Sequence, residues 1–526
     1  MRINIILFIV FAGFITGCSK DFLDRGPKDA LSPGTFWKTK QDADLALTGL
    51  YRGFESAGNL LYRDCGSDNS FNNFPWEGWR PIGDGTVSPT NPGSSYFNYS
   101  IINRCNEFLQ SAEAMDFEGK EIYMAQARFL RAYRYYLLTT NYGDVPLVTE
   151  VFLHPNDSKV PRDPKEKIQE FIESELKAVI PVLPPSYTAG EYGKATKGAA
   201  QALLARFYLY YGKYADALAA AKSITGYSLF PSYTGLFEPE NEQNSEVILS
   251  VQLTQDLYSI DFTPYLPNSI GGWSSVVPTQ QLVDAYEMAN GLTTAEAGAA
   301  YNPQNPYVNR DPRLRATVIY PGALFYNGKV YSSIVPEDND YYNKADNASK
   351  TGYNYRKYLN YVVPGTQFWN SGRDIYIFRY AEILLTIAEA KVELNQIDEE
   401  LYNAIDAVRE RAGMPPTDRA KYNNQAKLRE LVRRERRVEF AGEGLRRDDI
   451  IRWRIAPEVM NVELKGTKRG EVLSTTQPNG DHNVNLNLDA NVIESRSFAE
   501  KNYLLPIPQG AIDRNPELTQ NTGYGD

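Results

Sequence analysis

The sequence predicts a mainly α-helical protein: a tetratricopeptide-like superhelix of helical hairpins with long irregular insertions and minor short strands. Two observations lead to this fold class. Apolar residues recur at helical spacing in two regions, at about 120–225 and 375–455. Between and after these regions lie long stretches rich in Gly, Pro, Asn and Ser that show no such period. Repeated helical hairpins build a superhelix because each one buries its apolar face against the next.

The first predicted helix carries Ala127, Leu130 and Leu137 on one face. It should stop within residues 141–144, where Asn, Gly and Asp occur together. Pro146 follows just beyond, which is the usual position of a proline after a helix end.

A second helix pair is predicted over 197–224, with a turn at Gly212. The spacing of Gly212, Tyr214, Ala217 and Ala221 resembles the turn and second helix of a tetratricopeptide repeat. Small residues at these positions allow paired helices to approach closely. This pair should therefore form one hairpin of the superhelix.

A third pair is predicted to begin at Phe378. Its apolar face is spaced three and four residues apart: Phe378, Ala381, Leu385, Ala388 and Val392. The chain should turn at Asn395–Gln396, and the second helix should end before Gly413.

Four stretches are expected to be irregular: 64–95, 226–275, 301–372 and 465–495. The run from Glu246 to Gln252 is the clearest strand-like segment inside them. Loops of this length in a compact protein are more often functional than idle. The sequence therefore predicts a helical frame that carries irregular insertions on one side.

The first 17 residues predict an export signal that precedes a lipidated cysteine. Arg2 comes before an apolar run from Ile5 to Phe14, and Gly17 comes directly before Cys18. The run is too short to span a bilayer as a helix. A lipoprotein signal peptidase requires a small residue before the cysteine, so Cys18 is predicted to become the acylated N-terminus. The alternative is an ordinary secreted protein in which Cys18 is accidental.

The chain is then expected to have three parts. These are a signal peptide at 1–17, the lipidated cysteine with a polar tether at 18–28, and a single domain at 29–526. Extended helical-repeat folds reach this size as one body.

Composition restricts the class of ligand. The formal net charge of -10 argues against nucleic acid, because neutralising phosphates requires a basic face. His154 and His482 are the only histidines and have no nearby Cys or His, so no metal site or other cofactor is predicted. A structural calcium ion stays open, without support from the sequence. Beyond Cys18, Cys65 and Cys105 are equally compatible with one disulfide and with two free thiols.

Two helical segments resemble signature motifs of the SusD/RagB family, the outer-membrane nutrient-binding lipoproteins of Bacteroidetes. They are Ala127–Tyr133 with its exit turn Tyr142–Val148, and Phe378–Leu385 continuing through Ala388–Ala390. Further blocks resemble the family in the right order: Asp21–Asp24 with Thr35–Trp37, Val408–Gly413, Arg433–Glu439, Glu443–Arg446 with Arg452–Trp453, and Leu504–Pro508 with Asp513–Pro516. Gly442 and Arg447–Asp448 depart from it, since members often carry aromatic residues there.

The resemblance implies a non-enzymatic protein, anchored by lipid in the outer membrane and facing the extracellular medium. It implies a superhelix whose insertions display a ligand site. It also implies a partner, a SusC-like TonB-dependent outer-membrane barrel on which the protein sits as a lid. The ligand would be an oligosaccharide or polysaccharide that is captured at the surface and delivered into the barrel.

Three other functions stay open. Some relatives of this family capture peptides. A glycoside hydrolase would need a pair of carboxylates, and nothing in the sequence marks a particular pair. A pure protein-interaction scaffold would follow from the repeats, but it would leave the tryptophans of the loops unexplained.

A sugar site needs flat aromatic faces for the C–H side of pyranose rings and planar polar groups for the hydroxyls. The candidate ligand-binding residues are Trp76, Trp79, Trp273 and Trp369, with Asp68, Asn73, Arg80 and Arg373. The four tryptophans lie in stretches without helical period, whereas Trp37 and Trp453 lie in family blocks and are expected to be structural. The alternative for each loop tryptophan is a ring that fixes its own loop to the helical frame.

The arginine-rich stretch 429–454 invites an interpretation as a phosphate site. Acidic residues are interleaved with the arginines throughout: Glu430, Glu435, Glu439, Glu443, Asp448 and Asp449. An ion-paired helix face is therefore the preferred interpretation.

Overall fold

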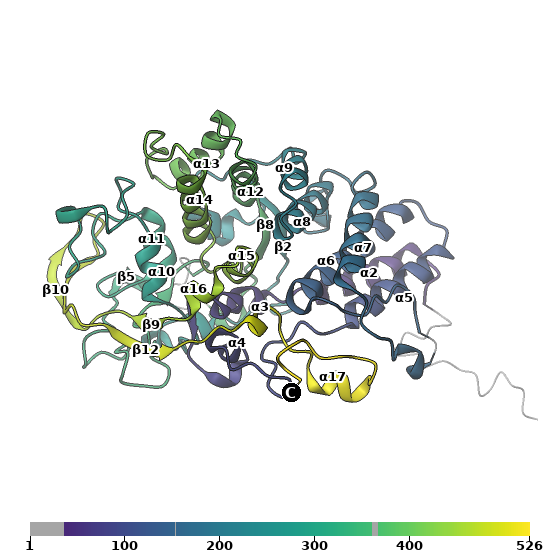
Figure 1. Ribbon diagram of the computed structural model, residues 1–526, viewed down its shortest axis with the longest axis horizontal. Helices are drawn as coiled ribbons and strands as arrows, with labels where there is room; N and C mark the ends of the chain where they lie inside the picture. The colour runs from purple at the N-terminus through teal and green to yellow at the C-terminus, as the bar shows by residue number, and fades with distance from the viewer. Residues whose placement is uncertain (1–35, 153, 360–366, 526) are drawn as a thin grey trace, which may run out of the picture.

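The computed structural model describes residues 36–152, 154–359 and 367–525. The predicted signal peptide, Cys18 and most of the family block at 21–37 lie outside these residues. Helices dominate the described part of the chain, and its strands are short. The predicted mainly α-helical fold class is confirmed, with the helical frame along the top and right of Figure 1.

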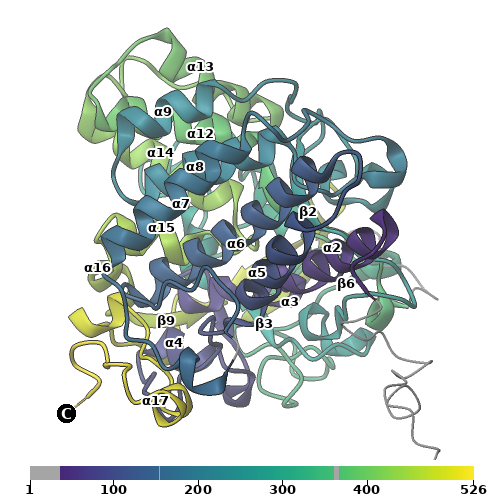
Figure 2. The same cartoon turned by 90° about the vertical axis from the view of Figure 1, so that its right-hand side faces the viewer.

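Nine helices of the described chain make up the frame. They are α2 (Lys40–Phe54), α5 (Ser100–Glu113), α6 (Lys120–Tyr142), α7 (Lys165–Val179), α8 (Lys197–Tyr210), α9 (Tyr214–Lys222), α12 (Tyr380–Glu393), α13 (Glu399–Arg411) and α14 (Gln425–Glu439). Neighbours in chain order pack on each other from α5 to α9. α9 then packs on α12, which packs on α13 and α14. Figure 2 shows these helices as one stacked series, as a repeat superhelix requires.

Glycines end two of the predicted helices at the expected positions. α6 ends at Tyr142, and Gly143 follows with φ of 71° while its N–H donates to the carbonyl of Thr139 at 2.9 Å. Gly212, with φ of 70°, makes the turn between α8 and α9. Only glycine adopts this left-handed backbone without steric cost, so both predicted ends are confirmed.

The third helix pair begins two residues later than predicted. Phe378 lies in strand β8 (Ile375–Arg379), where it pairs with Leu249 of β2 (Val247–Val251). The apolar spacing continues through the strand into α12, so periodicity alone could not show the boundary. The predicted turn is confirmed, with Asn395 at φ of 54°, and so is the strand at Glu246–Gln252.

The other half of the molecule consists of long loops, short helices and paired strands. Its short helices are α3 (Ala57–Tyr62), α4 (Arg80–Asp84), α10 (Gln280–Ala285), α11 (Pro312–Thr317), α15 (Arg446–Arg452), α16 (Ala456–Met460) and α17 (Gln509–Arg514). Its strands form antiparallel pairs: β1 (Ser70–Asn72) with β3 (Val276–Pro278), β4 (Val318–Ile319) with β7 (Asn354–Tyr355), and β5 (Leu324–Phe325) with β6 (Lys329–Val330).

The expectation of irregular structure over 465–495 was wrong. This stretch contributes to two ribbons, β9 (Glu463–Gly466) with β12 (Asn491–Ser495) and β10 (Gly470–Thr476) with β11 (His482–Leu486), which form the lower left edge of Figure 1. Val484 and Leu486 are buried while their neighbours are not, which is the alternation of a half-buried strand. The rest of the stretch is mostly polar, so this short alternation did not stand out in the sequence.

A buried ion network joins the helical frame to the loop-rich half. Its members are Arg313, Lys357, Arg379, Arg409, Arg411 and Arg434 with Glu246, Glu287, Asp311, Glu435, Glu439 and Glu443. Six cations thus face six carboxylates. Such balance is what allows charges to be buried, since an unpaired buried charge is very costly.

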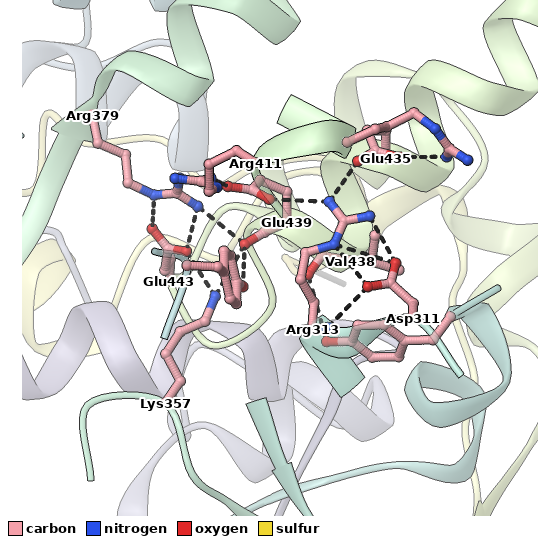
Figure 3. Close-up of polar contacts among 12 residues, drawn as sticks. Asp311, Arg313, Lys357, Arg379, Arg411, Glu435, Val438, Glu439 and Glu443 are labelled. Carbon is pink, nitrogen blue, oxygen red and sulfur yellow. Dashed lines mark hydrogen bonds and ion pairs between the residues drawn. The ribbon is translucent and has the colours of Figure 1, made fainter. Parts of the chain in front are cut away.

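Glu439 on α14 lies at the centre of this ion network (Figure 3). Its carboxylate pairs with Arg313 at 3.0 Å and with Arg379 at 2.7 Å, and it also pairs with Arg411. Arg313 belongs to α11, in the loop-rich half. Ion pairing of the arginine-rich stretch is confirmed, and Arg452 and Asp449 pair along one helix. Glu435, Glu439 and Glu443, however, are buried and pair with arginines of other elements, so for them the expected solvated helix face was wrong.

The two cysteines of the described chain, Cys65 and Cys105, are separate, buried free thiols. Their separation decides between the two alternatives that the sequence left open, in favour of two free thiols. Burial raises the pKa of both thiols, that of Cys105 to about 12. Across the described residues, no helix combines the length and apolarity that crossing a bilayer requires.

Candidate ligand-binding surface

Three of the four candidate tryptophans are exposed on loops of the described chain. Trp76 is 77% exposed, Trp369 is 56% exposed and Trp273 is 43% exposed. Leu257 accompanies them and is 78% exposed. Large apolar side chains exposed in this way mark an interaction surface when they occur together. We call these four residues the aromatic surface.

One segment, 254–278, ties the loops of the aromatic surface together. Near its end, β3 pairs with β1, and the carbonyl of Ser275 accepts the backbone N–H of Asn73 at 2.8 Å. Near its start, Ile260 and Ser371 exchange backbone hydrogen bonds of 2.9 Å in both directions. The segment therefore carries Trp273 between the loop of Trp76 and the loop of Trp369.

Trp76 stands on a single 3-10 turn, Pro75–Glu77, directly after β1. The ring of Phe74 stacks against its ring, with centroids 4.9 Å apart and planes 25° apart. Below the turn, Glu77 accepts a hydrogen bond from Nδ2 of Asn72 at 2.6 Å. The turn is thus fixed from beneath while one face of the indole stays open to solvent.

Trp273 is held by its backbone. Its N–H donates to the carbonyl of Thr263 at 2.9 Å, and the next N–H, of Ser274, donates to the carbonyl of Leu266 at 3.1 Å. Gly272 lies so close to the 3-10 turn Thr263–Tyr265 and its following residue that an added Cβ would be 2.0 Å from the oxygen of Leu266. Only glycine permits this approach, which fixes the direction in which the Trp273 ring leaves the chain.

The loops of Trp369 and Leu257 are joined by hydrogen bonds between their neighbours Asn370 and Asp256, which we call the Asp256–Asn370 clasp. Oδ1 of Asn370 accepts the backbone N–H of Asp256 at 2.9 Å, and Nδ2 of Asn370 donates to the carboxylate of Asp256 at 2.5 Å. Asp256 has φ of 67°, which turns the chain so that Leu257 is exposed beside this loop. Phe368 packs edge-on against Trp369, with ring centroids 5.2 Å apart.

Trp79 does not belong to the aromatic surface. Its ring is 1% exposed and packs in the core against Tyr96, with centroids 6.3 Å apart. It directly precedes α4, while Trp76 lies on the exposed turn before it. The sequence could not distinguish the two, because both flank the same glycine.

The polar candidates are mostly structural as well. Asp68 is buried and pairs with Arg437 and Arg446 at 2.8 Å each. Burial alone would raise the pKa of its carboxyl, but the two arginines outweigh burial and lower the pKa to about 2. Asp68 is therefore a permanent buried anion and is not available to a ligand.

Arg373 and Arg80 also form ion pairs within the protein. Arg373 is buried and its Nη1 pairs with Glu242 at 2.8 Å. Arg80 pairs with Glu494 at 2.8 Å and lies over the ring of Phe71. Asn73 is 7% exposed and donates to the carbonyl of Asp346 at 3.0 Å, so it supports the Trp76 loop from within.

Leu257 was not among the candidates. It is a single apolar residue in a polar turn, and nothing in its local pattern separates it from an ordinary loop leucine. Only the hydrogen bonds between Asp256 and Asn370, which join residues far apart in the sequence, show that the turn of Leu257 lies beside the loop of Trp369.

The fold and the surface together define a class: a helical-repeat protein that presents aromatic side chains on rigid loops. The chain belongs to the SusD family, whose profile matches residues 238–524. A second profile, described as starch-binding and associating with the outer membrane, matches residues 21–209. The predicted family membership is thus confirmed.

Solved and curated relatives agree over nearly the full length. A SusD-like carbohydrate binding protein from Bacteroides fragilis has 31% identity and a TM-score of 0.83, covering 92% of this chain and 100% of that one. SusD-like protein P25 of Formosa agariphila is 26% identical, over 88% of this chain and 92% of its own. The starch-binding protein SusD of Bacteroides thetaiotaomicron is 24% identical over 98% of both chains.

Proposed function

We propose that this protein captures oligosaccharide or polysaccharide at the cell surface and delivers it to a SusC-like TonB-dependent outer-membrane barrel. The ligand would bind to the aromatic surface. The protein would bind the glycan without cleaving it. The observation that carries the proposal is the presence of three exposed tryptophans on loops that a single segment ties together.

The chemistry of the aromatic surface suits sugars. An indole face accepts the apolar C–H side of a pyranose ring, and exposed backbone and amide groups around it can bond the hydroxyls. Several separate platforms suit a chain of sugars better than a single residue. The names of relatives point the same way, since those proteins are described as carbohydrate binding and starch-binding.

The expected loss of affinity follows from the apolar area that a bound sugar covers. One indole face covered by a sugar removes roughly 50–100 Å² from water, worth about 1.3–2.5 kcal/mol at ~25 cal/mol per Å². Removing one ring should therefore weaken binding by roughly eight- to seventy-fold. Removing all three should abolish measurable binding.

The test is a panel of polysaccharides run by affinity electrophoresis and calorimetry on the wild-type protein and on Trp76→Ala, Trp273→Ala and Trp369→Ala. Leu45→Ala is the matched control, because Leu45 is a 55% exposed apolar residue that lies on helix α2 and belongs to none of these loops. We expect each tryptophan variant to lose affinity for the retained glycan while the control does not. Unchanged glycan binding in all three variants would contradict the proposed site.

The same panel separates the rival ligands. Binding of a peptide digest, with no polysaccharide retained, would indicate the peptide-capturing function of some relatives. Release of reducing ends from a bound glycan would indicate a hydrolase. Neither result is expected.

Anchoring and delivery form the second part of the proposal. We infer a lipidated Cys18, a tether at 18–28 and one ligand-binding domain at 29–526, held at the outer surface beside the barrel. Support comes from the signal sequence and from the outer-membrane association given for the family. Cys18→Ala should lose surface labelling on intact cells and co-purification of a barrel protein, while the purified variant should bind glycan as the wild type does.

A further inference from the structure

A cavity that none of the exposed tryptophans lines lies between α11 and the turn of the β10–β11 ribbon. Its volume is 490 Å³, enough for one sugar ring with its substituents. Its charged lining residues are Arg310, Asp311, Arg315 and Arg356, and Tyr320 and Asn479 lie with them. Cations are unexpected here, because the chain as a whole carries a net charge of -10.

Arg356 has no carboxylate partner within the described residues. Its one side-chain hydrogen bond runs from Nη2 to the carbonyl of Leu324 at 2.7 Å, and its Nε is buried without a partner. Nearby Arg313, by contrast, pairs with three carboxylates. Burial lowers the pKa of Arg356 to about 10, and the positive charge of Arg315 adds to this effect, so the guanidinium is still charged at neutral pH.

Arg315 leaves one donor group free. Its Nε and Nη2 bond the two oxygens of Asp481 at 2.7 and 2.9 Å, and Nη1 has no partner in the part of the chain that is described. Asp481 also accepts from the hydroxyl of Tyr320 at 2.7 Å and from the N–H of Leu324 at 2.9 Å. Asp481 is therefore fully occupied and cannot also neutralise Arg356.

The backbone of Leu324 brings the two arginines together. Its N–H bonds Asp481, which holds Arg315, and its carbonyl bonds Arg356. Asp481 neutralises Arg315, and Asp311, the carboxylate of the lining, pairs with Arg313. Arg310 donates to the backbone carbonyls of Val283, Tyr286, Glu287 and Pro306. Among the described residues, Arg356 is therefore left at the wall of the cavity without a counter-charge. A charged guanidinium with unused donors is the group that recognises carboxylate or sulfate in proteins.

We propose that this cavity binds one anionic group, a carboxylate or sulfate carried by an acidic sugar residue or free as a small oxyanion, through Arg356 and Nη1 of Arg315. The site does not depend on the aromatic surface. It would allow the protein to hold acidic glycans in addition to neutral ones.

The first test uses the wild-type protein and needs no substitution. Ligand-observed NMR titration compares glucuronate with its methyl ester and with glucose, which keep the ring and lack the charge. We expect glucuronate to bind at least about tenfold more tightly than either neutral probe. Equal binding of the three probes would overturn the proposal.

Inorganic sulfate distinguishes the two sources of the anionic group. If sulfate displaces glucuronate at similar concentrations, the site takes an oxyanion alone. If sulfate displaces it only at much higher concentration, the sugar ring contributes and the group belongs to an acidic sugar. Displacement is expected in both cases, and its complete absence would contradict an oxyanion site.

The second test locates the site. Arg356→Gln removes the charge, while its amide can still bond the carbonyl of Leu324. Arg104→Gln is the control, because Arg104 is exposed on α5 and its substitution changes the net charge by the same amount. We expect glucuronate affinity to fall about tenfold or more in Arg356→Gln only. If it falls equally in both variants, or falls in Trp76→Ala and not in Arg356→Gln, the cavity is not the site.

Discussion

Glu439 provides the sharpest test of how the two halves of the protein are held together. The substitution Glu439→Gln keeps the size of the side chain and removes its charge. Glu439 is 0% exposed and pairs with Arg313, Arg379 and Arg411. After the change, the six cations of the ion network face five carboxylates.

The magnitude follows from the cost of an uncompensated buried charge. Removing one partner of a buried ion pair typically costs about 3–5 kcal/mol. A native domain is stable by only about 5–15 kcal/mol, so this loss is a large fraction of the total. We expect the free energy of unfolding of Glu439→Gln to fall by about 3–5 kcal/mol.

Urea denaturation at neutral pH, followed by circular dichroism and tryptophan fluorescence, measures this loss. Glu430→Gln is the control, because Glu430 is exposed on the same helix and the charge change is identical. The control should shift stability by no more than about 0.5 kcal/mol. A loss below about 1 kcal/mol in Glu439→Gln, or equal losses in the two variants, would refute the reasoning.

The pH dependence gives an independent check on Glu439. Burial alone would raise the pKa of its carboxyl, but Arg411, Arg379 and Arg313 outweigh burial and hold the pKa well below its ordinary value of 4.5. A carboxyl with a lowered folded-state pKa contributes fully above its unfolded-state pKa, and this contribution is lost as the pH falls. Acidification below 4.5 should therefore destabilise the wild type more than Glu439→Gln.

Three further substitutions separate structural residues from those that bind ligand. Trp79→Ala should cost about 3–5 kcal/mol of stability and leave the glycan affinity of the folded fraction unchanged, as denaturation and calorimetry would show; lost affinity without lost stability would contradict this. Asp68→Asn should cost a similar amount because it leaves two buried arginines without their anion, and a neutral effect on the unfolding free energy would be inconsistent with it. Gly272→Ala places a methyl group 2.0 Å from the oxygen of Leu266, so it should displace Trp273 and weaken glycan binding at least several-fold, whereas wild-type affinity would show that the loop adapts.

The sequence predicted the helices best where their ends carry a strong local signal. Gly143 and Gly212 mark helix ends because the left-handed backbone they adopt is costly for other residues. The start of α12 was missed because apolar spacing runs through β8 without a break. Helices α2 and α5 were not predicted, although Thr39 and Asp42 form a capping box that a search for helix starts would have found.

The loop tryptophans show where sequence reasoning about the site stops. Trp76 and Trp79 share one short segment, yet one ring is exposed and the other lies in the core. Whether a loop residue faces solvent depends on what the rest of the chain packs beneath it. For Trp79 the packing partners include Tyr96, a residue that follows α4 in the chain and packs back against the Trp79 ring.

Polar candidates were even less predictable, because a polar residue in a loop can be solvated or buried in an ion pair. Asp68 and Arg446 are paired although 378 positions separate them in the chain. No local pattern contains such a pairing. The same long-range pairing produced the buried ion network, whose carboxylates on α14 looked like a solvated helix face.

The central claim is that glycan binds on the aromatic surface, and a crystal structure with a bound oligosaccharide tests it most directly. The oligosaccharide should be the one that the polysaccharide panel retains. The account predicts pyranose rings lying against Trp76, Trp273 or Trp369, with Trp79 untouched in the core. Sugar bound on another face, with these three rings still open to solvent, would contradict it.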